Sequence, residues 1–98
     1  MEFVNNAFSL QMLQEDCRIN VTHINKKTFD TAKNKAVSVV GHKETADLLQ
    51  LPYNRTNITL KPGDTLYVAQ LVGGRLPEGC TQLPEGCNFK YLKVEITR

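Results

Sequence analysis

The sequence predicts an α/β fold, in which a mixed β-sheet of about five strands is flanked by helices within a single domain spanning residues 1–98. Short strand-like segments alternate along the chain with segments of helical spacing. Their order is strand, helix, two strands, helix and further strands, which indicates helices packed on a mixed sheet. The chain is long enough for one modest hydrophobic core, and its 41% hydrophobic and 22% charged residues are typical of a globular protein.

The first third of the chain is expected to form two strands and a short helix. Residues 2–8 indicate a short strand that runs into a turn. The Ser9 hydroxyl can then accept a free N–H of a helix that begins at Leu10. Residues 18–24 are rich in β-branched side chains and predict a strand, whereas the polar residues 28–34 predict a turn.

The centre of the chain predicts a strand followed by a helix. Residues 36–40 form a run of small and β-branched side chains, of the kind that lies buried inside a sheet. After Gly41 and His42, helical spacing predicts a helix over residues 43–51, and Pro52 ends it.

The last third predicts two long strands. Residues 57–60 are a weaker strand candidate, and residues 61–64 form a Pro-Gly turn. A clear strand is predicted over residues 65–72, where Gly73 follows, and another over residues 89–96.

A short repeat lies between these two strands. The pentapeptide Leu-Pro-Glu-Gly-Cys occurs at residues 76–80 and again at residues 83–87. Five residues are too few for a solenoid unit. We therefore expect two similar turns that bracket a loop.

Charge argues against a protein that grips duplex DNA. The net charge is only +2, and Lys26–Lys27 is the one adjacent basic pair. Proteins that bind duplex DNA usually carry a basic patch or stripe. A small anionic ligand held in a local pocket fits this charge better.

Cysteine usage and hydropathy favour a cytoplasmic protein. The chain has three cysteines, an odd number, and no Cys-x-x-Cys pair, so neither a zinc site nor a disulfide framework is predicted. A bridge between Cys80 and Cys87 stays open as the less favoured alternative. No apolar run approaches the ~20 residues of a membrane span, and no signal peptide is evident.

The segment Gly41-His42-Lys43-Glu44-Thr45 is the strongest candidate for chemistry. Free N–H groups at a helix start can bind an anion, so a phosphate near Gly41 and Thr45 would lie beside the His42 imidazole. Histidine can donate a proton near neutral pH. The alternative for His42 is a helix cap or an ordinary surface side chain.

Two further polar clusters are candidates for ligand contacts. Arg75 follows two glycines that let the backbone approach a ligand, and its guanidinium group suits a phosphate. Glu78 could orient Arg75, accept a proton or bond a ribose hydroxyl, although a solvated salt bridge on a loop would also explain the pair. Asn6 and Ser9 form the other cluster, which turn and capping roles also explain.

These clusters together resemble the viral ring nuclease family, which comprises anti-CRISPR proteins of archaeal viruses and bacteriophages, with bacterial relatives. Residues 6–13, 41–45 and 75–79 match in order, and the resemblance extends from Val4 to the last strand. It implies a mixed sheet flanked by helices and a homodimer with its ligand at the subunit interface. It also implies cleavage of cyclic tetra-adenylate, the second messenger of type III CRISPR defence.

The resemblance also assigns roles to residues. His42 matches the general acid of the family, and Arg75 and Glu78 match residues of its active site. Asn6 and Ser9 match ligand-contacting positions. So does Gln70, although its spacing to Arg75 is one residue longer than in the archaeal members. The segment after Gly79 is also shorter than the insertion that those members carry there.

The implied reaction needs neither a metal nor a cofactor. The ribose 2′-hydroxyl attacks the adjacent phosphorus in line, and His42 protonates the leaving 5′-oxygen. The linear products end in 2′,3′-cyclic phosphate, and type III CRISPR signalling stops. The main alternative is a module that binds cyclic oligoadenylate without cleaving it, as a sponge or a regulator. A DNA-binding regulator is disfavoured, because the charge is weak and no helix-turn-helix pattern is evident.

Overall fold

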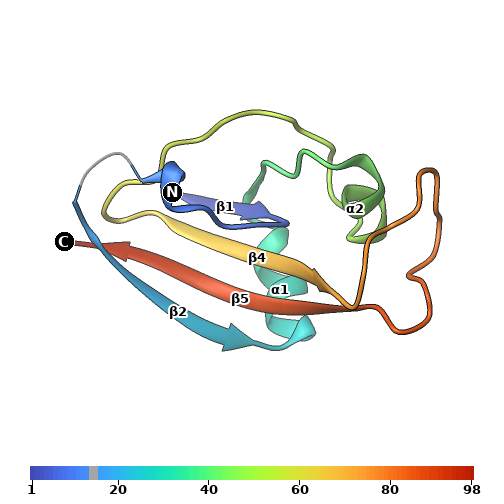
Figure 1. The fold of residues 1–98 in the computed structure, drawn as a ribbon. Helices are drawn as coiled ribbons and strands as arrows, with labels where there is room; N and C mark the ends of the chain where they lie inside the picture. Colours follow the sequence, from blue (N-terminus) through green and yellow to red (C-terminus); the bar gives the residue numbers. More distant parts are fainter. Residues whose placement is uncertain (14–15) are drawn as a thin grey trace.

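The computed structural model describes residues 1–13 and 16–98 and has the predicted α/β fold with a five-stranded mixed sheet (Figure 1). The strand order across the sheet is β2-β5-β4-β1-β3. The elements in chain order are β1 (Glu2–Asn5), the short 3₁₀ helix η1 (Leu10–Met12), β2 (Arg18–Ile24), α1 (Lys26–Lys33), β3 (Val37–Ser38), α2 (Lys43–Leu48), β4 (Thr65–Val72) and β5 (Asn88–Thr97).

Three strands of the sheet are parallel, and this arrangement fixes where the candidate site lies. β1 pairs in parallel with both β3 and β4, while β5 is antiparallel to β4 and β2. The carboxyl ends of β1, β3 and β4 therefore meet at one edge of the sheet, the right-hand edge in Figure 1. Ligands of open α/β sheets commonly bind at this edge.

The face of the sheet that α1 covers holds one part of the core. Phe29 of α1 is fully buried, and its ring centroid lies 5.0 Å from that of Tyr91 on β5. The buried cluster on this face comprises Val4, Phe29, Leu49, Tyr67 and Ala69.

The opposite face is covered by segments without regular helices. Side chains of η1 and its neighbours, with Ile58 from the long connection between α2 and β4, pack on this face. The buried cluster beneath them comprises Phe3, Val39, Leu60, Leu66, Val68, Val94 and Ile96. We call this side the open face, because Ile19 and Val21 of β2 are 38% and 48% exposed on it.

The turn predicted at residues 28–34 forms only at the end of that range, because residues 28–33 belong to α1 and the chain turns at residues 34–35. The Asn25 side chain accepts a 2.8 Å hydrogen bond from the Thr28 N–H and so caps the helix. Phe29 is the one α1 residue that is buried. A polar helix held by a single apolar side chain has too weak a periodic pattern to distinguish it from a turn.

The strand predicted over residues 36–40 is shorter and less central than expected. Only Val37 and Ser38 pair, and β3 lies at the edge of the sheet with Val37 44% exposed. Val39 and Val40 are buried, but the Val40 carbonyl accepts its 2.9 Å hydrogen bond from the Asn54 N–H and not from a strand. Apolar composition therefore predicted the burial of Val39 and Val40 correctly but overestimated the length of the paired strand.

Most of the remaining elements form where they are predicted, although the helices are shorter and one candidate strand does not form. Ser9 caps η1 by accepting the Gln11 N–H, and α2 ends at Leu48, before the predicted end at residue 51. The candidate strand at residues 57–60 is reduced to one bridge, between Leu60 and Leu13. The turn at residues 61–64 and the strands at residues 18–24 and 65–72 are confirmed, and the last strand is one residue longer at each end.

In the described part of the chain, no helix is long and apolar enough to cross a membrane.

Candidate functional site

The three predicted polar clusters follow the carboxyl ends of the three parallel strands. Asn6 follows β1, His42 comes four residues after β3, and Arg75 lies in the loop after β4. Asn5, the last residue of β1, pairs with Val68, so Gln70 lies on the part of β4 that extends beyond β1. Parallel pairing therefore brings the starts of all three segments to one edge of the sheet.

His42 is the N-cap residue of α2, and Thr45 fixes its ring. The His42 Nδ1 accepts the Thr45 N–H at 3.3 Å and lies 2.7 Å from the Thr45 Oγ1. Thr45 is buried, whereas the His42 side chain remains 48% exposed. With Nδ1 accepting, the proton of the neutral ring is on Nε2, which is left to donate a hydrogen bond.

This capping changes the anion site expected at the start of α2. The helix has six residues, and the Thr45 N–H that was expected to face a phosphate bonds to the imidazole. Thr45 therefore supports His42 directly. Gly41 lies against another side chain, since a Cβ at this position would be 3.3 Å from Cγ of Arg55.

Glu44 joins His42 to a distant loop, and no role was predicted for it. Its Oε2 lies 3.7 Å from Nε2 of His42, and its Oε1 accepts a 3.1 Å hydrogen bond from the Gly79 N–H. The Gly79 hydrogen bond is the main cause that lowers the pKa of the Glu44 carboxyl. The only sequence signal was an acidic residue in the first turn of a helix, which is common for dipole reasons alone.

The loop between β4 and β5 contains the two turns that the repeat predicts. The Cys80 N–H donates to the Pro77 carbonyl at 3.2 Å, and the Cys87 N–H donates to the Pro84 carbonyl at 3.1 Å. We call these the first turn (residues 77–80) and the second turn (residues 84–87). Glu44 binds the first turn, so residues 75–79 are held near α2.

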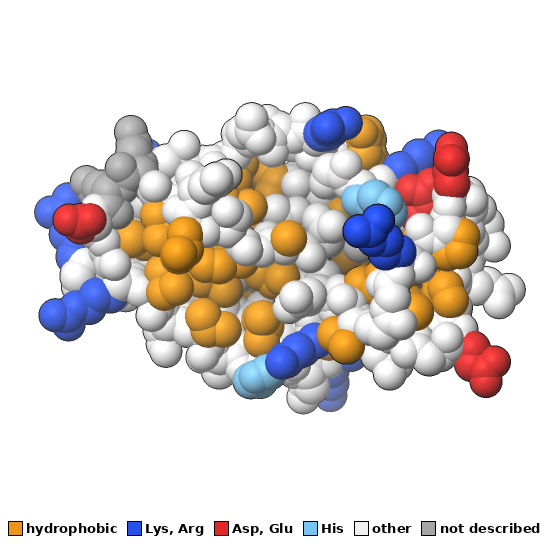
Figure 2. Space-filling view, in the orientation of Figure 1, with side chains coloured by type: hydrophobic (Ala, Val, Ile, Leu, Met, Phe, Trp, Pro, Cys, Tyr) orange, Lys and Arg blue, Asp and Glu red, His pale blue; other side chains and the backbone are white. Residues whose placement is uncertain are grey.

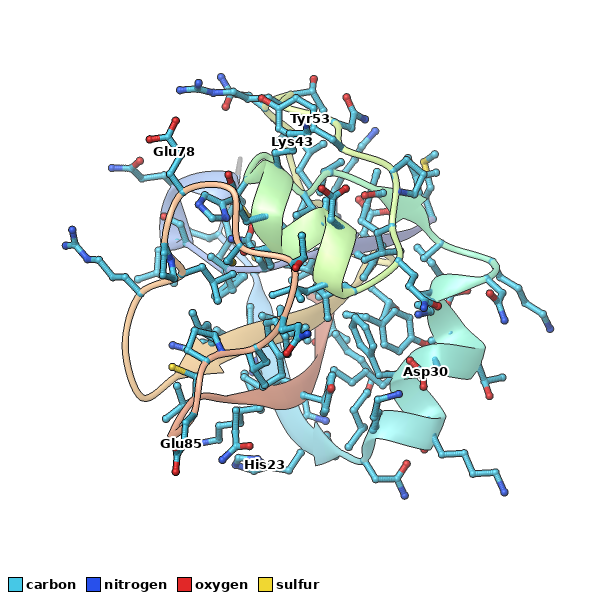
Figure 3. The ribbon with its side chains drawn as sticks, turned by 90° about the vertical axis from the view of Figure 1, so that its right-hand side faces the viewer. His23, Asp30, Lys43, Tyr53, Glu78 and Glu85 are labelled. Carbon is cyan, nitrogen blue, oxygen red and sulfur yellow. The ribbon has the colours of Figure 1, made fainter. Side chains whose placement is uncertain are left out.

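Arg75 and Glu78 are exposed on this loop. Neither forms a hydrogen bond or ion pair with another residue of the described chain, so the salt bridge considered as an alternative is not formed. Figure 3 shows Glu78 and Glu85 pointing outward from the loop. Both Arg75 and Glu78 are therefore accessible to a ligand.

Ser9 lines a cavity to which His42 does not contribute. The chain turns back along the sheet after β1 (Figure 1), and the Asn6 N–H donates to Asn5 Oδ1 at 2.8 Å. Asn5 and Ser9 line a cavity of about 410 Å³ together with residues 56–59. The structure thus brings His42, Thr45 and the first turn together, while Ser9 lines a separate cavity.

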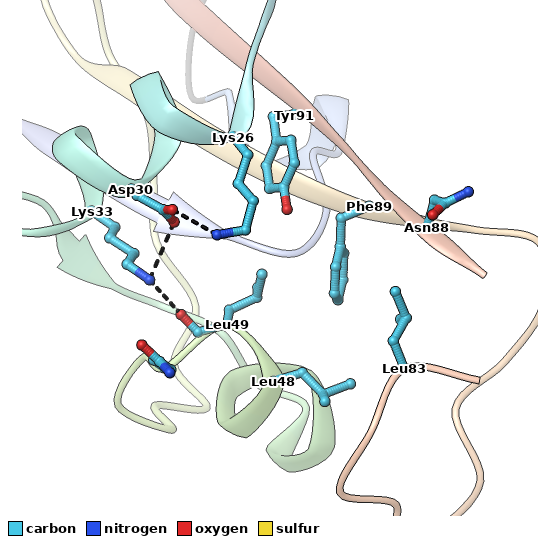
Figure 4. A pocket seen from close by; sticks show the side chains of 10 residues that line it. Lys26, Asp30, Lys33, Leu48, Leu49, Leu83, Asn88, Phe89 and Tyr91 are labelled. Atoms are coloured by element: carbon cyan, nitrogen blue, oxygen red, sulfur yellow. Dashed lines mark hydrogen bonds and ion pairs between the residues drawn. The ribbon is translucent and has the colours of Figure 1, made fainter. Parts of the chain in front are cut away.

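A larger cavity, of about 500 Å³, contains none of the predicted site residues. It lies between α1, the end of α2 and the start of β5 (Figure 4). Its charged rim is internally paired, because Asp30 binds Lys26 at 2.8 Å and Lys33 at 3.4 Å. Lys33 also donates to the Leu49 carbonyl at 2.8 Å.

Metal-ligating residues do not gather at the site. Over residues 1–13 and 16–98, no group of three or more His, Cys, Asp or Glu side chains could hold a metal ion. The three cysteines are free in the structure, and Cys87 is buried.

Comparison with known proteins finds matches over most of the chain. A family described as STIV B116-like matches residues 2–88. Among solved structures, B116 of Sulfolobus turreted icosahedral virus (STIV) superposes with a TM-score of 0.78 and 22% sequence identity, covering 96% of this chain and 97% of that chain. At this identity the superposition shows a shared fold. No curated protein sequence matches the chain.

Proposed function

Because the chain belongs to the STIV B116-like family, we propose that it is a metal-independent ring nuclease that cleaves cyclic tetra-adenylate. The observation that carries this proposal is the setting of His42. Its Nδ1 is engaged by Thr45, its Nε2 is left to donate, and the side chain is 48% exposed. The loop that carries Arg75 and Glu78 is tied to the same helix.

The proposed reaction uses the 2′-hydroxyl of the substrate as nucleophile. The 2′-hydroxyl attacks the adjacent phosphorus and releases its proton to water, and the bond to the 5′-oxygen breaks. The leaving 5′-oxygen takes the Nε2 proton of a cationic His42, whose Nδ1–H would donate to Thr45 Oγ1 in that form, and the imidazole is left neutral. In-line positioning is worth up to ~7–11 kcal/mol in favourable cases, and protonation of the leaving group adds roughly 10²–10⁴-fold. Arg75 would stabilise charge on the phosphorane, and Glu78 would bond a ribose hydroxyl.

A homodimer that forms through the open face would complete the binding site. Paired strand residues share a face, so the register puts Gln70 on the same side as Val68 and the exposed Ile19 and Val21. Figure 2 shows apolar side chains gathered over β5 and β2 on this face. Exposed apolar patches of this kind mark interfaces, and a two-fold dimer would offer two equal sites to a symmetric ring.

The same dimer would give the Asn6 and Ser9 cluster a role. Asn5 lies on the face of Val68 and Gln70, and Ser9 lines a cavity with it. A ring that spans the interface would extend beyond this cavity. Ser9 and Asn6 would therefore contact one part of the ligand while His42 acts on another. In the host cytoplasm, cleavage of the ring would shut off type III CRISPR signalling.

The test is cleavage of labelled cyclic tetra-adenylate by the wild type and by His42→Asn, each with and without a chelator. Asparagine is a good N-cap residue, so this variant keeps the start of α2 and removes the proton donor. We expect wild-type cleavage to persist in chelator and the variant to be slower by roughly 10²–10⁴-fold. His42→Ala serves as the comparison, because it removes the cap as well and should cost about 1 kcal/mol of stability.

Each arm has an outcome that contradicts the proposal. Equal rates for the wild type and His42→Asn would remove His42 from the mechanism. Loss of wild-type activity in chelator would show that a metal is needed. Tight binding of the ring without turnover would instead identify a module that sequesters it.

A further inference from the structure

The two carboxylate oxygens of Glu44 contact two different parts of the molecule. Oε1 accepts the Gly79 N–H at 3.1 Å, and Oε2 lies 3.7 Å from Nε2 of His42. We propose that Glu44 is a positioning residue that holds the first turn on α2 and orients the proton-donating nitrogen of His42. The first role stands on the structure alone, and the second rests on the proposed function.

Glu44 supplies the polar attachment of the loop to the site. Among the described residues, the Gly79–Glu44 hydrogen bond is the only one that joins the loop between β4 and β5 to any other segment. The Glu44 side chain is only 18% exposed, so water competes weakly for it. Arg75 and Glu78 precede Gly79 in the same segment, so their position depends on this attachment.

The repeat shows that the attachment comes from Glu44 and not from the turn itself. The first and second turns have the same sequence, and Gly79 and Gly86 both adopt positive φ, at 74° and 84°. The second turn is held differently, because the Gly86 carbonyl packs against the backbone of Gly73. Two copies of one turn are thus fixed by a carboxylate in one case and by backbone packing in the other.

The second oxygen of Glu44 faces the nitrogen that the reaction needs. Thr45 engages Nδ1 of His42, and among the described residues Glu44 is the partner that faces Nε2. The carboxylate restricts motion of the ring by attracting the Nε2 proton. Because the separation is 3.7 Å, longer than a hydrogen bond, the proton remains available to an incoming oxygen.

Three variants separate these two roles. Glu44→Gln keeps an oxygen that can accept the Gly79 N–H but removes the charge opposite His42. Glu44→Ala removes both contacts. Asp47→Asn is the matched control, because it removes an exposed carboxylate from the same helix, and the Asp47 side chain forms no hydrogen bond or ion pair with the described residues.

Amide hydrogen exchange tests the attachment without substrate. We expect the Gly79 amide to exchange roughly tenfold faster in Glu44→Ala, the size expected for loss of a hydrogen bond to a charged acceptor. The exchange rate of the Gly79 amide should change little in Glu44→Gln and in Asp47→Asn. The Gly86 amide is an internal reference that should not change in any variant. Equal Gly79 exchange in the wild type and Glu44→Ala would overturn the attachment.

Cleavage of cyclic tetra-adenylate tests the orientation of His42. We expect Glu44→Gln to lower kcat by roughly tenfold or more with KM nearly unchanged, because the loop stays in place and only the imidazole loses its orientation. Glu44→Ala should also raise KM. An unchanged kcat in Glu44→Gln would overturn the orienting role. If the wild type itself does not cleave the ring while Gly79 is protected by Glu44, the proposed function fails and the attachment stands.

Discussion

At the scale of single residues, the site is built from side chains that each perform a structural task as well. His42 is the N-cap residue of a helix, and Thr45 donates its N–H to the His42 ring and so fixes the orientation of the ring. Glu44 occupies the first helical turn and binds a backbone N–H of a distant loop. A substitution at any of these positions therefore perturbs structure and chemistry together, so variants that keep the structural task are the informative ones.

Gly73 provides a test of close backbone approach. It adopts φ +103°, and a Cβ there would overlap the Gly86 carbonyl, whereas Gly63 adopts φ +97° with no atom within 4 Å of such a Cβ. Both Gly→Ala changes incur the cost of a positive φ, about 1 kcal/mol. Only Gly73→Ala also pushes the second turn away from the backbone that follows β4. We expect thermal denaturation to show a clearly larger loss of melting temperature for Gly73→Ala than for Gly63→Ala. Equal losses would contradict the close packing of Gly73 against the Gly86 carbonyl.

At the scale of elements, α1 is the clearest case of a helix that depends on its tertiary contact. It has eight residues with one buried side chain, and Asn25 caps it. Lys26 and Asp30 pair across one turn, a contact that is worth little at an exposed site. An isolated helix of this length is unstable in water, so docking of Phe29 on the sheet holds α1 in place.

Phe29→Ala tests this dependence. The ring is fully buried between β4 and β5 residues, so we expect its removal to cost ~3–5 kcal/mol of the free energy of unfolding. Thr31→Ala on the same helix is the control, since Thr31 is exposed and should change stability by less than about 0.5 kcal/mol. Urea denaturation of the two variants makes the comparison. Similar losses would mean that the Phe29 contact does not anchor α1.

At the scale of the whole molecule, the two faces of the sheet differ in how they are covered. α1 covers one face, while exposed apolar side chains of β2 remain on the other. The site lies at the edge where these faces and the parallel strands meet. A second copy on the open face would bury the apolar side chains and enclose the ligand at once.

Val21→Lys tests this assembly. Val21 is 48% exposed on the open face, so a charge there should weaken a face-to-face dimer. Thr22→Lys is the matched control, because its side chain is on the opposite face of the same strand. We expect sedimentation equilibrium to give a dimer for the wild type and Thr22→Lys, and a monomer for Val21→Lys. A monomeric wild type, or a dimer in all three proteins, would contradict an interface on this face.

The sequence by itself determined the strands and turns that local chemistry specifies. The strands at residues 18–24 and 65–72 and the two Leu-Pro-Glu-Gly-Cys turns were predictable, because β-branched runs and Pro-Gly pairs act through near neighbours. The polar clusters at Asn6, His42 and Arg75 were also recognisable as candidates, since their residue types carry the relevant chemistry.

Only the tertiary structure decided how these parts combine. Residues 28–33 are helical because Phe29 packs against the sheet, and β3 is a short edge strand because only two of its residues pair with β1. The link from Glu44 to Gly79 joins residues 35 positions apart. No local pattern encodes such contacts, because they arise only when parallel strands bring three loops to one edge. Composition thus supplied the chemistry of the site, and strand pairing supplied its geometry.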